Sequence, residues 1–68
     1  MRIDAVKLRT VLYQKGLTQG DLVKLSGVSR ATVNAVATGK NCSRSTAERI
    51  ANALDMKLEE LHQAAAGK

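Results

Sequence analysis

Three glycines, at positions 16, 27 and 39, each follow a short amphipathic segment, and this spacing constrains the fold more than any other feature of the sequence. Glycine readily adopts the left-handed backbone conformation that ends many helices, so each of these residues is a natural helix terminator. The chain has no proline and only one aromatic residue, and it lacks the alternation of apolar and polar residues that is typical of strands. The sequence therefore predicts an all-α fold of short helices.

Apolar residues at helical spacing and residues that cap helices predict five helices in one domain, residues 1–68, with about 62–68 as a fraying tail. The predicted helices run from Asp4 to Lys15, from Thr18 to Ser26, from Ser29 to Thr38, from a capping box at Ser45–Glu48 to Leu54, and from Met56 to Ala64 or Ala65. Their predicted apolar faces comprise Val6, Leu8, Val11, Leu12, Leu22, Val23, Leu25, Val33, Val36, Ala47, Ile50, Ala51, Leu54, Leu58 and Leu61.

Several classes of protein are excluded by what the chain contains. A single cysteine, Cys42, cannot form an internal disulfide, and with His62 as the only histidine no metal-binding set has the usual spacing. No apolar run approaches the roughly 18 residues of a membrane-spanning helix. The residues also offer no catalytic pairing of nucleophile and base and no glycine-rich phosphate loop. We therefore expect a protein that is not an enzyme, uses no metal or small-molecule cofactor, and acts away from membranes.

The charge of the chain points to a polyanionic partner. Eleven lysines and arginines against six acidic residues give a formal net charge of +5. The excess is concentrated in residues 1–49, which hold nine basic and three acidic residues, whereas residues 50–68 carry a net charge of −1. A basic surface of this kind is typical of nucleic-acid-binding domains.

The second and third predicted helices have the layout of a helix-turn-helix. Two short helices are joined by a tight turn that contains Gly27, and Val33 and Val36 supply branched apolar anchors on the second helix. With these anchors turned inward, residues 30, 31, 34 and 35 fall on the opposite arc. That arc is expected to enter the major groove of DNA.

The sequence resembles the phage repressor and Cro (Xre-type) family of helix-turn-helix proteins. The segments that carry the resemblance are Gly16–Gln19, Gly27–Val33, Thr38–Lys40, Thr46–Leu54 and Leu58–Leu61, which cover almost the whole chain in the family's order. The resemblance implies a lambda-repressor-like domain of five helices that binds a two-fold symmetric DNA operator as a homodimer in the bacterial cytoplasm. It leaves open whether the chain is a complete Cro-like protein or the DNA-binding part of a longer repressor.

Four positions depart from the family's pattern. The family often has an arginine late in the first helix and a glutamate late in the third, which form a partly buried ion pair; here these positions hold Leu12 and Ala37. Replacing both charges with apolar residues can be neutral or stabilising, so the double change predicts a repacked apolar contact. Val23 stands where alanine is usual, and Gly20 where glutamate is common.

The residues expected to contact DNA fall into two groups. Arg30 can bond O6 and N7 of guanine, and Asn34 can bond N6 and N7 of adenine, although a phosphate contact or plain solvation is the alternative for each. Predicted base contacts are Arg30, Ala31, Thr32, Asn34 and Ala35; predicted phosphate contacts are Thr18, Gln19, Ser29, Lys40, Asn41, Ser43 and Arg44. Thr18 is also expected to cap its helix, and the resemblance implies that Gln19 braces the first recognition residue.

Two functions remain open from the sequence. The first is a sequence-specific regulator of transcription, a repressor, whose third helix reads an operator half-site and whose dimer forms through Leu58 and Leu61. The alternative for these two leucines is a place in the core of the chain itself. The second function is an antitoxin-type module that binds a partner protein and contacts DNA mainly in that complex.

Overall fold

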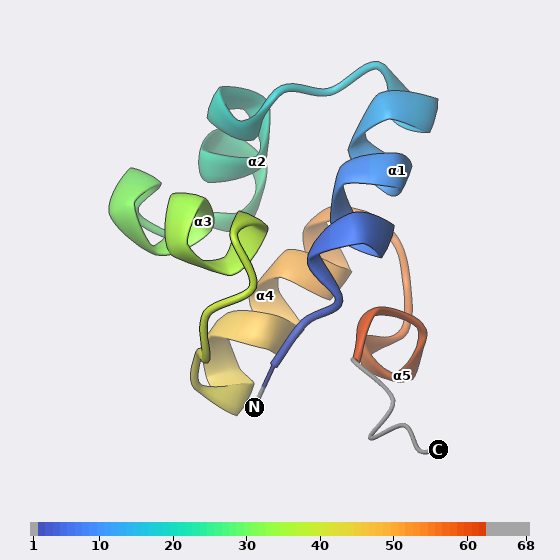
Figure 1. The fold of residues 1–68 in the computed structure, drawn as a ribbon. Helices are drawn as coiled ribbons and strands as arrows, with labels where there is room; N and C mark the ends of the chain where they lie inside the picture. Colours follow the sequence, from blue (N-terminus) through green and yellow to red (C-terminus); the bar gives the residue numbers. More distant parts are fainter. Residues whose placement is uncertain (1, 63–68) are drawn as a thin grey trace.

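The computed structural model describes residues 2–62, and within them five helices surround one core (Figure 1). The helices are α1 (Ala5–Lys15), α2 (Gln19–Ser26), α3 (Arg30–Ala37), α4 (Arg44–Ala53) and α5 (Leu58–Leu61). The predicted all-α fold of five helices is confirmed. No helix in the described part of the chain is long and apolar enough to cross a membrane. Ala64, Ala65 and the predicted tail beyond residue 62 lie outside the described residues.

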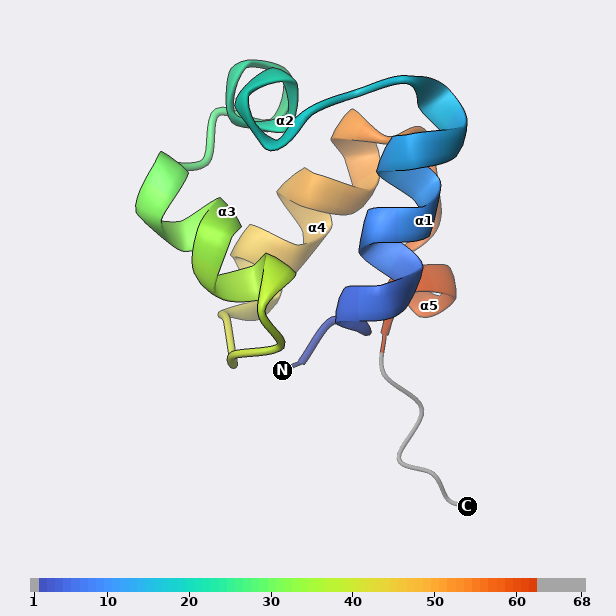
Figure 2. The ribbon, with the colours of Figure 1, turned by 45° about the horizontal axis from the view of Figure 1, so that its top comes forward.

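Helix α4 lies at the centre of the fold. Helices α2 and α3 are on one side of it, and α1 and α5 are on the other (Figures 1 and 2). Helix α2 packs against both α3 and α4, while α1 packs against α3 and α5 packs against α4. This arrangement leaves one face of α3 uncovered.

The helix ends follow the capping pattern of the sequence with two differences. Gly16, Gly27 and Gly39 all have positive φ, at 70°, 71° and 89°. The cap of α4 is Ser43 and not Ser45, because the Oγ of Ser43 accepts a hydrogen bond from the backbone N–H of Thr46 at 3.1 Å. Helix α5 is also shorter than predicted, since it begins at residue 58 and ends where the next residue becomes extended.

The core is entirely apolar. Leu8, Leu22, Val33, Val36, Ile50, Leu54 and Leu61 are among its fully buried side chains. No polar or charged residue within residues 2–62 is buried. Leu12 and Ala37, the positions that lack the family's ion pair, are 5% and 1% exposed, which agrees with an apolar contact in place of that pair.

Two residues assigned to the apolar faces are exposed. Val6 is 75% exposed because the inward face of α1 is formed by residues 8, 11 and 12, and Val6 lies on the far side of the helix. Leu25 is 57% exposed. Ser26 takes the half-buried place one turn after Leu22, where its Oγ donates to the carbonyl of Leu22 at 2.7 Å and accepts from the N–H of Val28 at 3.2 Å.

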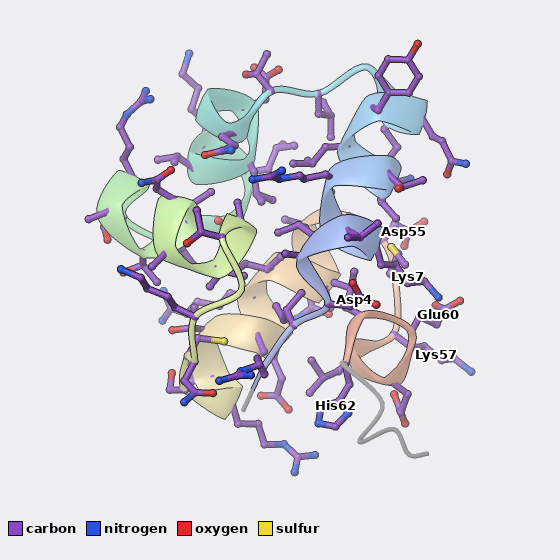
Figure 3. The ribbon with its side chains drawn as sticks, in the orientation of Figure 1. Asp4, Lys7, Asp55, Lys57, Glu60 and His62 are labelled. Atoms are coloured by element: carbon purple, nitrogen blue, oxygen red, sulfur yellow. The ribbon has the colours of Figure 1, made fainter. Side chains whose placement is uncertain are left out.

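A short N-terminal segment, Arg2–Asp4, links two distant parts of the chain. Arg2 forms an isolated antiparallel bridge with Asn41, and Ile3 forms another with His62. Asp4 then caps α1, since its side chain accepts hydrogen bonds from the first turn of that helix. Asp4 lies between α1 and α5 in Figure 3. The segment is thereby placed beside the loop between α3 and α4.

Candidate nucleic-acid interface

The turn between α2 and α3 holds the two helices in a fixed relation. Gly27 ends α2 in the left-handed conformation, and Val28 is buried immediately after it. Ser29 then caps α3 by accepting a hydrogen bond from the N–H of Thr32 at 3.2 Å. The turn residues therefore fix the direction in which α3 leaves α2.

Helix α3 has one buried face and one exposed face, as the sequence predicted. Val33, Val36 and Ala37 are buried, whereas Arg30, Ala31 and Asn34 are exposed. Thr32 and Ala35 are half-buried at the edges of the exposed face. The five side chains predicted to contact bases thus lie on one helix, and three of them form the centre of its exposed surface.

Arg30 connects α3 with the beginning of α2. A Cβ atom placed on Gly20 would lie 3.5 Å from an Nη atom of the Arg30 guanidinium. The guanidinium therefore lies over the first turn of α2, where free backbone N–H groups are concentrated at the positive end of the helix dipole. At this distance a Cβ atom would make an ordinary van der Waals contact with the arginine, so the position of Arg30 does not require glycine at residue 20.

Thr18 caps α2 in a reciprocal capping box. Its Oγ1 accepts from the N–H of Asp21 at 3.1 Å, and Oδ2 of Asp21 accepts from the N–H of Thr18 at 2.9 Å. Hydrogen bonding to the carboxyl by the backbone N–H of Thr18, and to a lesser degree by its side chain, lowers the pKa of Asp21 below its ordinary value. The predicted capping role of Thr18 is confirmed, and Gln19, half-buried in the first turn, follows directly after it.

Two of the predicted phosphate contacts have hydroxyls that are hydrogen-bonded inside the chain. The Oγ of Ser29 is bonded to Oγ1 of Thr32 at 2.9 Å, and the Oγ of Ser43 is bonded to Oγ1 of Thr46 at the same distance. Each pair of hydroxyls uses one of its two hydrogens for this bond and keeps the other for an outside acceptor such as a phosphate. Thr46 was not singled out from the sequence.

The loop between α3 and α4 follows directly on α3 and carries further polar groups. Lys40, Asn41, Ser43 and Arg44 are all exposed. Arg44 forms an ion pair with Glu48 of α4 at 3.5 Å, and both side chains are largely exposed. Such surface pairs contribute little stability, so the pair holds Arg44 only weakly. Arg2, which the sequence reasoning left out, reaches this loop through its bridge with Asn41.

The two leucines predicted at a dimer contact differ in exposure. Leu61 is fully buried in the core of its own chain, so its side chain offers no surface to a second subunit. Leu58 is half-buried and lines a shallow hollow of about 310 Å³ with Arg44, Glu48, Glu59 and His62. The alternative of a core position thus holds for Leu61, and Leu58 stays a predicted dimer contact.

Within the described part of the chain, the thiol and the possible metal ligands form no second site. Burial raises the pKa of the half-buried Cys42 thiol above its ordinary value, which disfavours the reactive thiolate. Among residues 2–62, no group of three or more histidine, cysteine, aspartate or glutamate side chains could hold a metal ion.

Helix α3 has an exposed polar face and is anchored by its buried face. A glycine turn joins it to a second short helix, α2. This arrangement defines a helix-turn-helix DNA-binding domain. The chain belongs to the Cro/C1-type HTH DNA-binding domain family, whose profile matches residues 7–64. This match confirms the resemblance found in the sequence.

Two solved structures have a fold similar to that of this chain. The restriction-modification controller protein C.AhdI from Aeromonas hydrophila is 37% identical, with a TM-score of 0.79 over 85% of this chain and 89% of that chain. PhpD, solved with cadmium and hydroethylphosphonate, is 22% identical and has a TM-score of 0.81 over 98% of this chain but only 15% of its own. The likeness to PhpD shows the fold alone. No curated protein sequence matches this chain significantly.

Proposed function

We propose that this protein is a sequence-specific regulator of transcription, a repressor, that places α3 in the major groove of an operator half-site in the bacterial cytoplasm. The observation that carries the proposal is the exposed face of α3, with Arg30, Ala31 and Asn34 at its centre and a fully buried face behind it. A helix held in this way presents base-reading groups on a rigid support.

The chemistry of this face suits direct readout of bases. Arg30 can donate two hydrogen bonds to O6 and N7 of guanine, and Asn34 can both donate to and accept from adenine. The methyl groups of Ala31 and Ala35 suit contact with a thymine methyl, and the hydroxyl of Thr32 can reach a base or a phosphate. Arg30 must extend from its position over Gly20 to meet a base edge.

Phosphate contacts would supply most of the affinity. The beginning of α2, with Thr18 and Gln19, offers the positive end of a helix dipole to one strand. The second group consists of Ser29, Lys40, Asn41, Ser43 and Arg44, all of which are exposed. Because these contacts displace counterions, the association constant should fall steeply as salt concentration rises.

We further propose that the protein binds DNA as a homodimer, with Leu58 at the contact between subunits. The hollow around this half-buried leucine is lined by Arg44, Glu48 and Glu59. In a dimer with two-fold symmetry, the arginine of one subunit can therefore face the glutamates of the other. A dimer would place two α3 helices about 34 Å apart, in successive major grooves. The similarity to C.AhdI makes genes of a restriction-modification system the first candidates for regulation.

The test is a footprint of the purified protein on the DNA that flanks its own gene, at fixed salt and with random duplex in excess. A protected site with two-fold symmetry is the expected result. Loss of all protection under the competitor would contradict sequence-specific binding by the protein alone. Protection that appears only after a partner protein is added would instead favour the antitoxin-type module.

A further inference from the structure

The N-terminal segment is held firmly at the edge of the proposed DNA interface. Ile3 is buried in the core, and the N–H of Asp4 donates to the carbonyl of Leu61 at 2.9 Å. These contacts fix the segment on one side, and the backbone bridge between Arg2 and Asn41 fixes it on the other. Both ribbon views place the segment that leads into α1 beside the loop that joins α3 to α4 (Figures 1 and 2).

The side chains of the bridged residues also contact each other. The Nε of Arg2 donates a hydrogen bond to Oδ1 of Asn41 at 3.4 Å, and both side chains are exposed. This bond turns the acceptor oxygen of the amide toward Arg2, so the amide NH₂ group points away from the arginine. The guanidinium keeps the N–H groups of its two Nη atoms for another partner. The pair therefore presents several hydrogen-bond donors, while the amide oxygen of Asn41 is already bonded to Arg2.

A donor-rich pair with a positive charge suits a phosphate. An arginine fork matches the geometry of phosphate oxygens, and charge-assisted hydrogen bonds of this type are stronger than neutral ones. Lys40 is adjacent in sequence to Asn41, and Arg44 begins the next helix, so the surrounding charge is also favourable. The acidic side chain of Glu48 is paired with Arg44 at 3.5 Å.

We propose that Arg2 is a further phosphate-binding residue of the DNA interface and that it orients the amide of Asn41 toward the same stretch of DNA backbone. The inference rests on the proposed function, because it assumes that the loop between α3 and α4 faces DNA. It adds a contact from Arg2, which lies 39 residues before Asn41 in the sequence. The N-terminal segment thereby becomes part of the binding surface.

The experiment measures binding of fluorescent duplexes over a series of salt concentrations, using a duplex selected by the wild-type protein and a random duplex. The variants are Arg2→Gln, Arg2→Lys, Asn41→Ala and the double variant Arg2→Gln/Asn41→Ala. Lys7→Gln is the matched control, because it removes one positive charge from α1 on the side where Lys7 lies near α5 (Figure 3). Circular dichroism melting establishes the temperature at which every variant is folded.

Arg2→Gln should lower affinity by about threefold to tenfold on both duplexes and reduce the slope of log K against log salt by about 0.9, the value for one lost phosphate contact. Arg2→Lys should keep the slope but bind more weakly than wild type, because lysine lacks both the Nε–H that holds the amide and the fork that matches a phosphate. The double variant should lose less than the product of the two single losses. Lys7→Gln should leave the slope close to that of wild type.

Three results would overturn the inference. If Arg2→Gln and Lys7→Gln change the slope equally, Arg2 binds no phosphate while the proposed function stands. If the Arg2 and Asn41 losses multiply independently, the orienting role is wrong. If the wild-type protein selects no duplex and binds none, the proposed function fails and this inference fails with it.

Discussion

Replacing Ala37 with glutamate tests whether the apolar contact between α1 and α3 tolerates a single charge. Ala37 is 1% exposed, and the core around it, which includes Leu12, holds no buried polar residue within the described chain. An unpaired carboxylate at such a position costs roughly 3–5 kcal/mol. A single core in so small a domain supplies about the same amount, roughly 3–5 kcal/mol. We therefore expect Ala37→Glu to be largely unfolded at neutral pH.

Two further variants separate charge from size. Ala37→Gln adds a side chain of nearly the same volume without the charge, so it should retain more stability than Ala37→Glu. Adding Leu12→Arg to Ala37→Glu supplies a partner for the carboxylate and should recover part of the loss. Urea denaturation followed by circular dichroism gives the free energy of unfolding for each variant.

The dependence on pH provides an independent check of the same charge. Burial raises the pKa of the Glu carboxyl introduced at Ala37 above its value in the unfolded chain. The folded state of Ala37→Glu is then favoured below the unfolded pKa, about 4.3, and loses stability as pH rises through the raised folded pKa. Equal stabilities of Ala37→Glu and Ala37→Gln at every pH would refute the reasoning, since burial of charge would then have no effect.

Three other changes test separate parts of the structure. Asp55 follows α4 with φ at 57°, so Asp55→Gly should raise the free energy of unfolding by roughly 0.5–1 kcal/mol, and Asp55→Ala should not, as urea denaturation would show. The backbone N–H of Thr18, and to a lesser degree its side chain, lower the pKa of Asp21, so their contribution to stability is present above the unfolded pKa and lost as pH falls through the folded one. Thr18→Ala keeps the backbone donor and should flatten this acidic part of the melting profile only in part, whereas Asp21→Asn should remove the contribution of this residue. Gly20→Glu places a carboxylate beside the Arg30 guanidinium and should weaken binding of a selected duplex more than Gly20→Gln does, in a fluorescence titration.

Most of the fold could be predicted because its signals are local. Gly16, Gly27 and Gly39 end helices through a backbone conformation that depends on the glycine itself. The buried face of α3 likewise follows from the spacing of Val33 and Val36, which helical geometry places on one side. Where a short segment carries both a terminator and a clear apolar face, sequence alone is sufficient.

The errors occurred where local patterns allowed more than one answer. Ser43 and Ser45 both precede the fourth helix, and the choice between them depends on which hydroxyl reaches a free N–H. Leu25 is apolar and close to a buried residue, yet Ser26 takes the half-buried place because its hydroxyl closes the turn. In both cases the hydrogen bonds of one serine hydroxyl decide what composition cannot.

The candidate interface was predictable as a face but not as a set of contacts. Helical geometry places the recognition residues together, whereas the position of Arg30 over Gly20 depends on how two helices pack. Arg2 could not be found from the sequence, because its partner Asn41 lies 39 residues away and no local pattern connects them. Contacts of this kind arise only once the N-terminal segment is placed against the loop.

Binding of wild type and Arg30→Ala to two duplexes at one salt concentration tests the central claim most directly. The first duplex is the sequence selected by the wild-type protein, and the second is random. If α3 reads bases, the substitution should cost roughly 1–3 kcal/mol on the selected duplex and little on the random one. An equal loss on both duplexes would mean that Arg30 contacts only phosphates, and the assignment of α3 as the base-reading element would be contradicted.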